Sequence, residues 1–226
     1  MDAKPKANFN LVAEPTGLGK ERRGGAVNLL LGAIILEAGR MLKEGRSFNE
    51  VELASQKAFG QPQGLLSFCQ QLGFPKIMEF LNYLAQDDFD DELLKVYDNF
   101  FSLKENVFSL PGENIASLVE KKITGDLDEK TMNLLVRRFL AVAFMVAAEV
   151  LGAGLVEMSK LEEACQQTLG WKKGPFSLMN QVGIQETMRM VIEQLEICHR
   201  KEINFPVPDI LINQAQANAP WVIKVM

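Results

Sequence analysis

The sequence has few of the side chains on which most catalytic and metal sites depend. Its 226 residues include one histidine and three widely separated cysteines, Cys69, Cys165 and Cys198. No Cys-x-x-Cys pair or Cys/His cluster occurs, so we expect no metal site. An odd number of separated cysteines is typical of reduced thiols in a cytosolic protein.

The histidine also stands apart from other catalytic residue types. His199 is followed by Arg200 and Lys201 near the end of an expected helix. An exposed histidine is favoured at a helix C-terminus. The alternative is a general base, and that needs placed partners.

Common nucleotide and nucleophile motifs are missing as well. The sequence contains no P-loop and no Gly-x-Ser-x-Gly elbow. The glycine-rich pieces Thr16–Lys20 and Gly152–Gly154 are too short for a dinucleotide fingerprint, which must also follow a strand. We therefore expect no cofactor-binding residue in this chain.

A basic excess is absent too, because the net charge is −5. General nucleic-acid binding needs a basic footprint, so we expect no nucleic-acid partner. The first six residues, Met1–Lys6, are polar and lack the apolar core of a signal peptide. Together with the cysteines, they favour a cytoplasmic protein.

One long apolar run is present, from Phe139 to Val156. It approaches the ~18 residues that suggest a membrane span. Glu149, Gly152 and Gly154 interrupt it, and a helix that is apolar on all sides can instead be buried in a core or an oligomer interface. We expect burial and no membrane span, and we expect the protein to self-associate or to need a partner.

The pattern predicts an all-α protein, because no alternating strands are evident. The expected helices are 25–43, 48–59, 65–69, 75–84, 129–156, 159–169, 176–182 and 185–199. Ser47 and Glu50 have capping-box spacing. The acidic cluster Asp87–Glu92 is interpreted as a solvated helix start, with a metal site as the alternative. From Pro206 onward we expect an ordered tail with Trp221 near its end.

A repeated glycine motif divides the chain. Gly60, Gly64 and Gly73 recur as Gly170, Gly174 and Gly183, always 110 residues later. A helical segment precedes each copy, and Leu110-Pro111-Gly112 breaks the chain between them. The repeat predicts a tail over 1–19 and two similar tandem units over 20–112 and 113–226.

Asn28 is the candidate site residue. It is a lone amide in a helix that is otherwise apolar on every side. A buried amide without a hydrogen bond costs about 1–3 kcal/mol, so either a structural hydrogen bond or a ligand is needed.

These motifs resemble the C-terminal all-α region of the L-3-hydroxyacyl-CoA dehydrogenase family, duplicated as in multifunctional fatty-acid β-oxidation enzymes. Gly170–Ile184 is similar to the family's Gly-x-Pro-x-Gly-Pro-Phe-x-x-x-Asp-x-x-Gly-Leu. Gly24–Asn28, Leu36–Ala38, Glu44-Gly45 and Gly154 match other family positions. The departures are Arg23 for proline, Leu29 for arginine, Arg137 for asparagine, and Gln70 and Asn180 for aspartate, whereas Arg138 matches the family arginine.

The resemblance implies a fold of the 6-phosphogluconate/3-hydroxyacyl-CoA dehydrogenase C-terminal type. It also implies that Asn28 is the catalytic asparagine that holds the substrate oxygen of an acyl-CoA. Lys20, Arg22 and Arg23 would meet CoA phosphates, although a basic cluster beside a helix start is commonly just solvated. NAD and the catalytic His–Glu pair would belong to a missing domain or a separate subunit.

Two functions follow as hypotheses. The first is the substrate-binding and dimerisation part of a 3-hydroxyacyl-CoA dehydrogenase, inactive alone and joined to a NAD-binding domain or subunit in a homo- or hetero-oligomer. The second is a non-catalytic helical scaffold or interaction subunit derived from the same fold. The departures from the family pattern favour the second.

Overall fold

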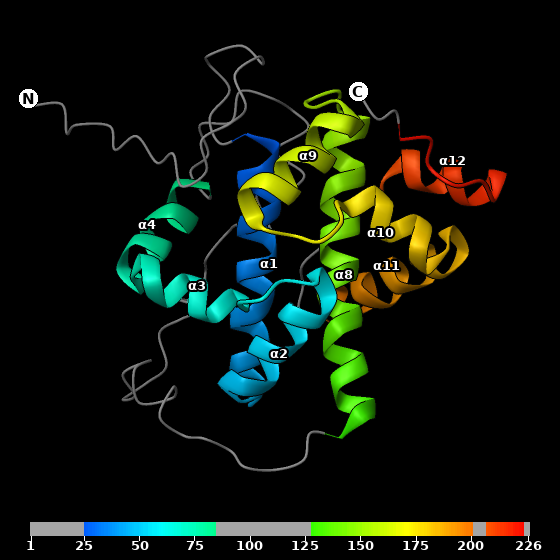
Figure 1. Ribbon diagram of the computed structural model, residues 1–226. Helices are drawn as coiled ribbons and strands as arrows, with labels where there is room; N and C mark the ends of the chain where they lie inside the picture. Colours follow the sequence, from blue (N-terminus) through cyan, green and yellow to red (C-terminus); the bar gives the residue numbers. More distant parts are fainter. Residues whose placement is uncertain (1–24, 85–127, 201–206, 224–226) are drawn as a thin grey trace, which may run out of the picture.

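The structure is a computed structural model that describes residues 25–84, 128–200 and 207–223. All regular secondary structure in these ranges is α-helical, which confirms the predicted class (Figure 1). The helices are α1 (Ala26–Lys43), α2 (Phe48–Phe59), α3 (Leu65–Leu72), α4 (Phe74–Leu84), α8 (Glu129–Gly152), α9 (Met158–Leu169), α10 (Pro175–Val182), α11 (Ile184–His199) and α12 (Asp209–Ala217).

Several sequence predictions fall outside the described residues. They concern the tail over 1–19, the basic residues Lys20, Arg22 and Arg23, the acidic cluster Asp87–Glu92 and the chain break at Leu110–Gly112. The predictions for these segments stay as predictions.

Helices α1 and α8 form the centre of the molecule, where they lie side by side and antiparallel (Figure 1). Their apolar side chains are buried almost without interruption, and residues 139–148 of α8 are all buried. The predicted burial of the run 139–156 is thereby confirmed for its first ten residues, whereas Gly152 and Gly154 near its end are exposed. In the part of the chain that the structure describes, no helix is long and apolar enough to cross a membrane.

Helix α8 ends four residues before the predicted end at Val156. The backbone N–H groups of Gly154 and Leu155 donate to the carbonyls of Leu151 and Val150. These bonds fold the chain back across the last turn, which closes a helix and satisfies its final carbonyls.

The glycine repeat of the sequence is also a repeat of helices. Helix α9 begins at Met158 and α2 at Phe48, a difference of 110, and α10 and α3 differ by the same number at both ends. The long helices end at Lys43 and Gly152, a difference of 109. The connection from α8 to α9 is therefore one residue longer than the one from α1 to α2.

The two sets of helices are interlocked. Helix α2 packs on α8 and α9 packs on α1, so each second helix contacts the long helix of the other set. The buried side chains of both sets form one hydrophobic core. Burial on this scale is the main source of stability in a protein of this size.

The C-terminal segment packs onto the second set of helices. Helix α12 contacts α8 and α11, and Trp221 lies edge-on to Phe176 of α10 with ring centroids 5.1 Å apart. Asn180 of α10 donates to the carbonyl of Trp221 at 2.9 Å and accepts from its N–H at 2.7 Å. Two hydrogen bonds and a buried indole therefore hold this segment, which was expected to be ordered.

Candidate functional site

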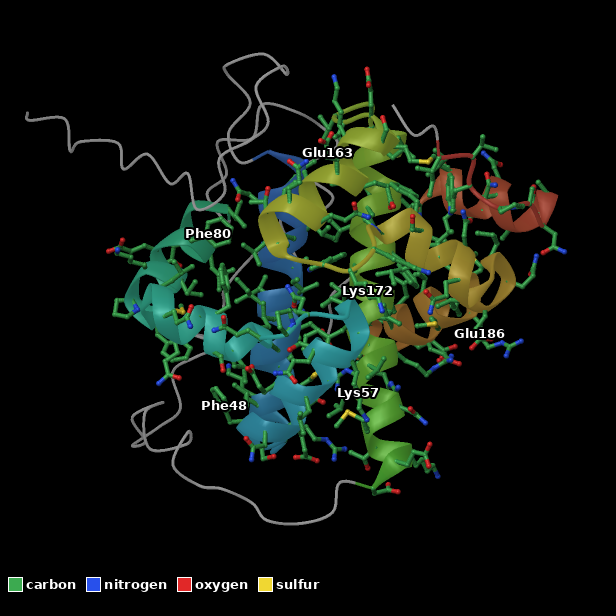
Figure 2. All side chains as sticks on the ribbon, in the orientation of Figure 1. Phe48, Lys57, Phe80, Glu163, Lys172 and Glu186 are labelled. Carbon is green, nitrogen blue, oxygen red and sulfur yellow. The ribbon has the colours of Figure 1, made fainter. Side chains whose placement is uncertain are left out.

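The two copies of the glycine turn meet each other at the junction of the repeats. Gly60 and Gly170 end α2 and α9 with φ angles of 66° and 68°, a conformation in which glycine replaces other residues without strain. The N–H of Lys172 donates to the carbonyl of Phe59 at 2.9 Å. Figure 2 shows Lys172 in the segment between α9 and α10, near the end of α2.

The repeat-related hydrogen bond cannot form, because Pro62 occupies the position equivalent to Lys172 and has no N–H. The carbonyl equivalent to that of Phe59 belongs to Leu169. It accepts a hydrogen bond from the side-chain amide of Gln61 instead. A side chain thus replaces the missing backbone donor, and both helix-end carbonyls are satisfied.

A buried carboxylate lies at the start of each third helix. Glu52 accepts from the N–H groups of Gly64 at 3.0 Å, Leu66 at 3.0 Å and Ser67 at 3.1 Å. These are the groups with which a helix N-terminus binds an anion.

Glu162 occupies the equivalent place in the second set of helices. It accepts from the N–H groups of Phe176 at 2.6 Å and Ser177 at 3.1 Å, and from the Ser177 hydroxyl at 2.5 Å. Gly64 lies against Glu52, and Gly174 lies against Glu162. A Cβ atom added to either glycine would lie within 2.5 Å of the carboxyl carbon of that glutamate. In both copies a glutamate of the protein occupies the helix N-terminus at which a phosphate would bind. Gly64 and Gly174 therefore allow the close packing of that glutamate and do not cradle a phosphate.

The three cysteines are free and buried. Burial raises the pKa of the Cys69 thiol far above its usual range, and the nearby charge of Glu52 adds to the effect. Burial likewise raises the pKa of Cys165, helped by Glu162. A nucleophilic cysteine needs a lowered pKa, so these two thiols belong to the core.

A buried ion cluster joins the two long helices. Arg138 of α8 donates to Glu37 of α1 through Nε at 2.7 Å and to Glu44 through Nη1 at 2.5 Å. Arg40 approaches the other oxygen of Glu37 at 3.4 Å. Burial alone would lower the pKa of Arg138, but the charges of Glu37 and Glu44 hold it above its ordinary value.

The ion pair has no counterpart at the repeat-related positions. With the offset of 109 that relates the ends of the two long helices, Leu29 corresponds to Arg138 and Val146 to Glu37. Both Leu29 and Val146 are buried and apolar. An arginine at position 29 would therefore have no carboxylate at position 146 to pair with.

Asn28 lies in the first turn of α1 and is 3% exposed. Its side-chain oxygen Oδ1 is buried without a hydrogen-bond partner among the described residues. The sequence prediction of a structural hydrogen bond thus gains no support from the ranges 25–84, 128–200 and 207–223. A buried acceptor without a donor is unfavourable, and it is the arrangement in which a ligand hydroxyl improves the site.

A pocket of about 250 Å³ lies between the two glycine turns. Its walls come from α1, the first turn, α3, the end of α9 and the second turn. It is lined by Leu31, Ile34, Gln61, Pro62, Gln63, Leu65, Phe68, Gln167, Thr168, Leu169, Gly170 and Trp171. Asn28 is not among the lining residues, although Leu31 follows it by one helical turn. Sequence reasoning missed this pocket, because its walls are joined only by the packing of one repeat on the other.

The other residues that were compared with the dehydrogenase pattern have structural partners or face solvent. Asn180 holds the C-terminal segment, and the equivalent Gln70 is exposed. Arg137, at the asparagine position of the second unit, pairs with Glu186 at 2.5 Å and Glu193 at 2.7 Å on α11. Among the described residues, the buried side-chain atoms without a hydrogen-bond partner are Oδ1 of Asn28, Oε1 of Gln194 and Nε1 of Trp221; of these three residues, only Asn28 was singled out by its sequence motif.

Within the described ranges, no three His, Cys, Asp or Glu side chains are grouped to hold a metal ion. NAD binding in the expected manner needs a strand followed by a glycine turn and a helix. The regular elements of the described residues are all helices, so these residues contain no strand–glycine–helix unit of that kind.

Comparison with models of known protein families, with curated proteins and with solved structures finds no match for this chain. The likeness to the dehydrogenase family therefore stays a resemblance of motifs.

Proposed function

We propose that this chain is the substrate-binding and dimerisation part of a 3-hydroxyacyl-CoA dehydrogenase. It would act together with a NAD-binding domain or subunit that supplies the catalytic base. The partner would close over the face of α1 that carries Asn28, and acyl-CoA would lie between the two.

The observation that supports the proposal is the unsatisfied oxygen of Asn28. A carboxamide can accept a hydrogen bond from a 3-hydroxyl group and, through its NH₂, donate one to the 3-keto oxygen. Such a group suits a substrate whose oxygen changes from alcohol to ketone. Hydrogen bonds that strengthen at the reacting oxygen in a dry site are effective in catalysis.

The proposal is tested on the assembly purified from its source. Native mass spectrometry should show a NAD-binding chain or domain with this one, and the assembly should oxidise 3-hydroxybutyryl-CoA. Asn28→Ala in that assembly should lower kcat more than it raises KM. A loss of about ten- to a thousandfold is expected for one oxyanion-type donor.

A second candidate is a non-catalytic helical scaffold, and a specific observation favours it. The polar side chains near the motifs make structural hydrogen bonds and are not free to bind a ligand. Glu52 and Glu162 cap helices. Asn180 holds the C-terminal segment, and Arg138 joins the repeats. A homo-oligomer without affinity for CoA compounds would support the scaffold and contradict the dehydrogenase.

A further inference from the structure

We propose that the pocket between the two glycine turns is a binding site for a small uncharged molecule with an apolar body and one hydroxyl group. The site is separate from Asn28, and its argument does not depend on the proposed dehydrogenase function.

The walls select an apolar body. Leu31, Ile34 and Leu65 contribute aliphatic surface, and Phe68 and Trp171 contribute aromatic surface. Trp171 is only 3% exposed, because its indole stacks on Phe59 with centroids 4.0 Å apart. The indole of Trp171 is therefore held against Phe59 where it lines the pocket.

The absence of charge on the described walls of the pocket disfavours ionised ligands. None of the described residues that line the pocket carries an ionisable side chain. An anion or cation entering the pocket would lose its hydration without gaining a partner of opposite charge, which is strongly unfavourable.

Two polar side chains of the lining are available to a ligand hydroxyl. Gln61 and Gln167 are engaged with Leu169 and Glu163. The side chains of Gln63, which is half-buried, and Thr168, which is exposed, make no hydrogen bond to another described residue. Their amide and hydroxyl can both donate and accept, so a ligand hydroxyl can be satisfied there.

The volume of the pocket suits a medium-chain alcohol. An apolar cavity of about 150 Å³ holds benzene, and this pocket measures about 250 Å³. A molecule of about eight to ten carbon atoms is the matching size on that scale.

The test compares 1-octanol with octanoate, since the two probes share their apolar chain and differ in charge. Binding to the full chain at neutral pH is followed by saturation-transfer NMR with titration. We expect 1-octanol to bind at least about tenfold more tightly than octanoate. Absence of octanol binding, or equal binding of both probes, would overturn the proposal.

Two variants locate the binding. Thr168→Phe fills the pocket and should weaken octanol binding at least about tenfold. Gln166→Phe is the matched control, because position 166 is exposed on the same helix and does not line the pocket; it should leave binding within about twofold. Octanol binding that both variants reduce equally, or that neither reduces, would show that the alcohol binds elsewhere and would contradict the site.

Discussion

The indole of Trp171 lies parallel to the ring of Phe59, with centroids 4.0 Å apart and planes 10° apart. The two residues belong to different repeats, and each stands at the junction of a second helix with its glycine turn. Beside them the N–H of Lys172 donates to the carbonyl of Phe59. The stacked rings and this hydrogen bond therefore join the end of α2 to the turn after α9.

The substitute hydrogen bond of Gln61 can be tested by its removal. Gln61→Ala leaves the carbonyl of Leu169 without a donor and should lower the free energy of unfolding by about 1 kcal/mol. Urea denaturation measures the change. Gln63→Ala is the control, because Gln63 makes no such bond among the described residues. Equal effects of the two substitutions would show that the Gln61 bond contributes nothing.

The carboxylate of Glu162 should contribute more to the free energy of unfolding than the Gln61 hydrogen bond does, because it is buried and accepts three hydrogen bonds. Glu162→Ala should destabilise the protein by about 3 kcal/mol or more, since donors at the start of α10 lose a charged acceptor. The neighbouring Glu163 is exposed on the outer side of α9 (Figure 2). Glu163→Ala should change stability by less than about 0.5 kcal/mol, and a similar loss for both variants would contradict the capping interpretation.

The ion cluster predicts a large difference between adjacent arginines. Arg138→Met leaves the fully buried Glu37 with one remaining ion pair among the described residues, the 3.4 Å contact to Arg40, and should cost about 3–5 kcal/mol. Arg137→Met removes partly exposed ion pairs and should cost about 0–1 kcal/mol. Thermal and urea unfolding of both variants provide the comparison.

A double substitution checks the explanation. Glu37→Met together with Arg138→Met removes both buried charges and should restore most of the stability lost in the single variant. If the double variant is as unstable as Arg138→Met, the loss comes from packing and not from an unpaired charge.

The unpaired oxygen of Asn28 should lower the free energy of unfolding, and an apolar residue at this position should restore it. Because Oδ1 lacks a donor within the described residues, Asn28→Leu should leave the protein equally stable or up to about 2 kcal/mol more stable. A drop of about 1–3 kcal/mol would instead show that the amide makes a structural hydrogen bond. Urea denaturation separates the two outcomes.

The fold could be predicted largely from local signals. Ser47 and Glu50 form the predicted capping box, with the Ser47 N–H donating to Glu50 at 2.7 Å. Gly60 and Gly170 mark the predicted helix ends, because few other residues adopt their backbone conformation. Helix α12 was predicted only as ordered tail, since Ile210, Ile212 and Asn213 have modest helix propensity and tertiary packing decides their conformation.

The site was less predictable, because its contacts join residues far apart in the sequence. Asn28 could be singled out as a lone amide in an apolar helix. The partner of Arg138 lies 101 residues away, and no local pattern pairs it with Glu37. The pocket walls likewise come together only when α1, α3 and the end of α9 pack, which periodicity alone does not specify.

The central claim is tested most directly by calorimetric titration of 3-hydroxybutyryl-CoA and butyryl-CoA onto the assembly purified from its source and the same assembly with Asn28→Ala. The two ligands differ only in the hydroxyl that Asn28 is proposed to hold. The account predicts that the assembly prefers the hydroxylated ligand by about tenfold, the equivalent of ~1.4 kcal/mol, and that Asn28→Ala loses the preference. Failure of both ligands to bind, or a preference that survives in the folded variant, would contradict it.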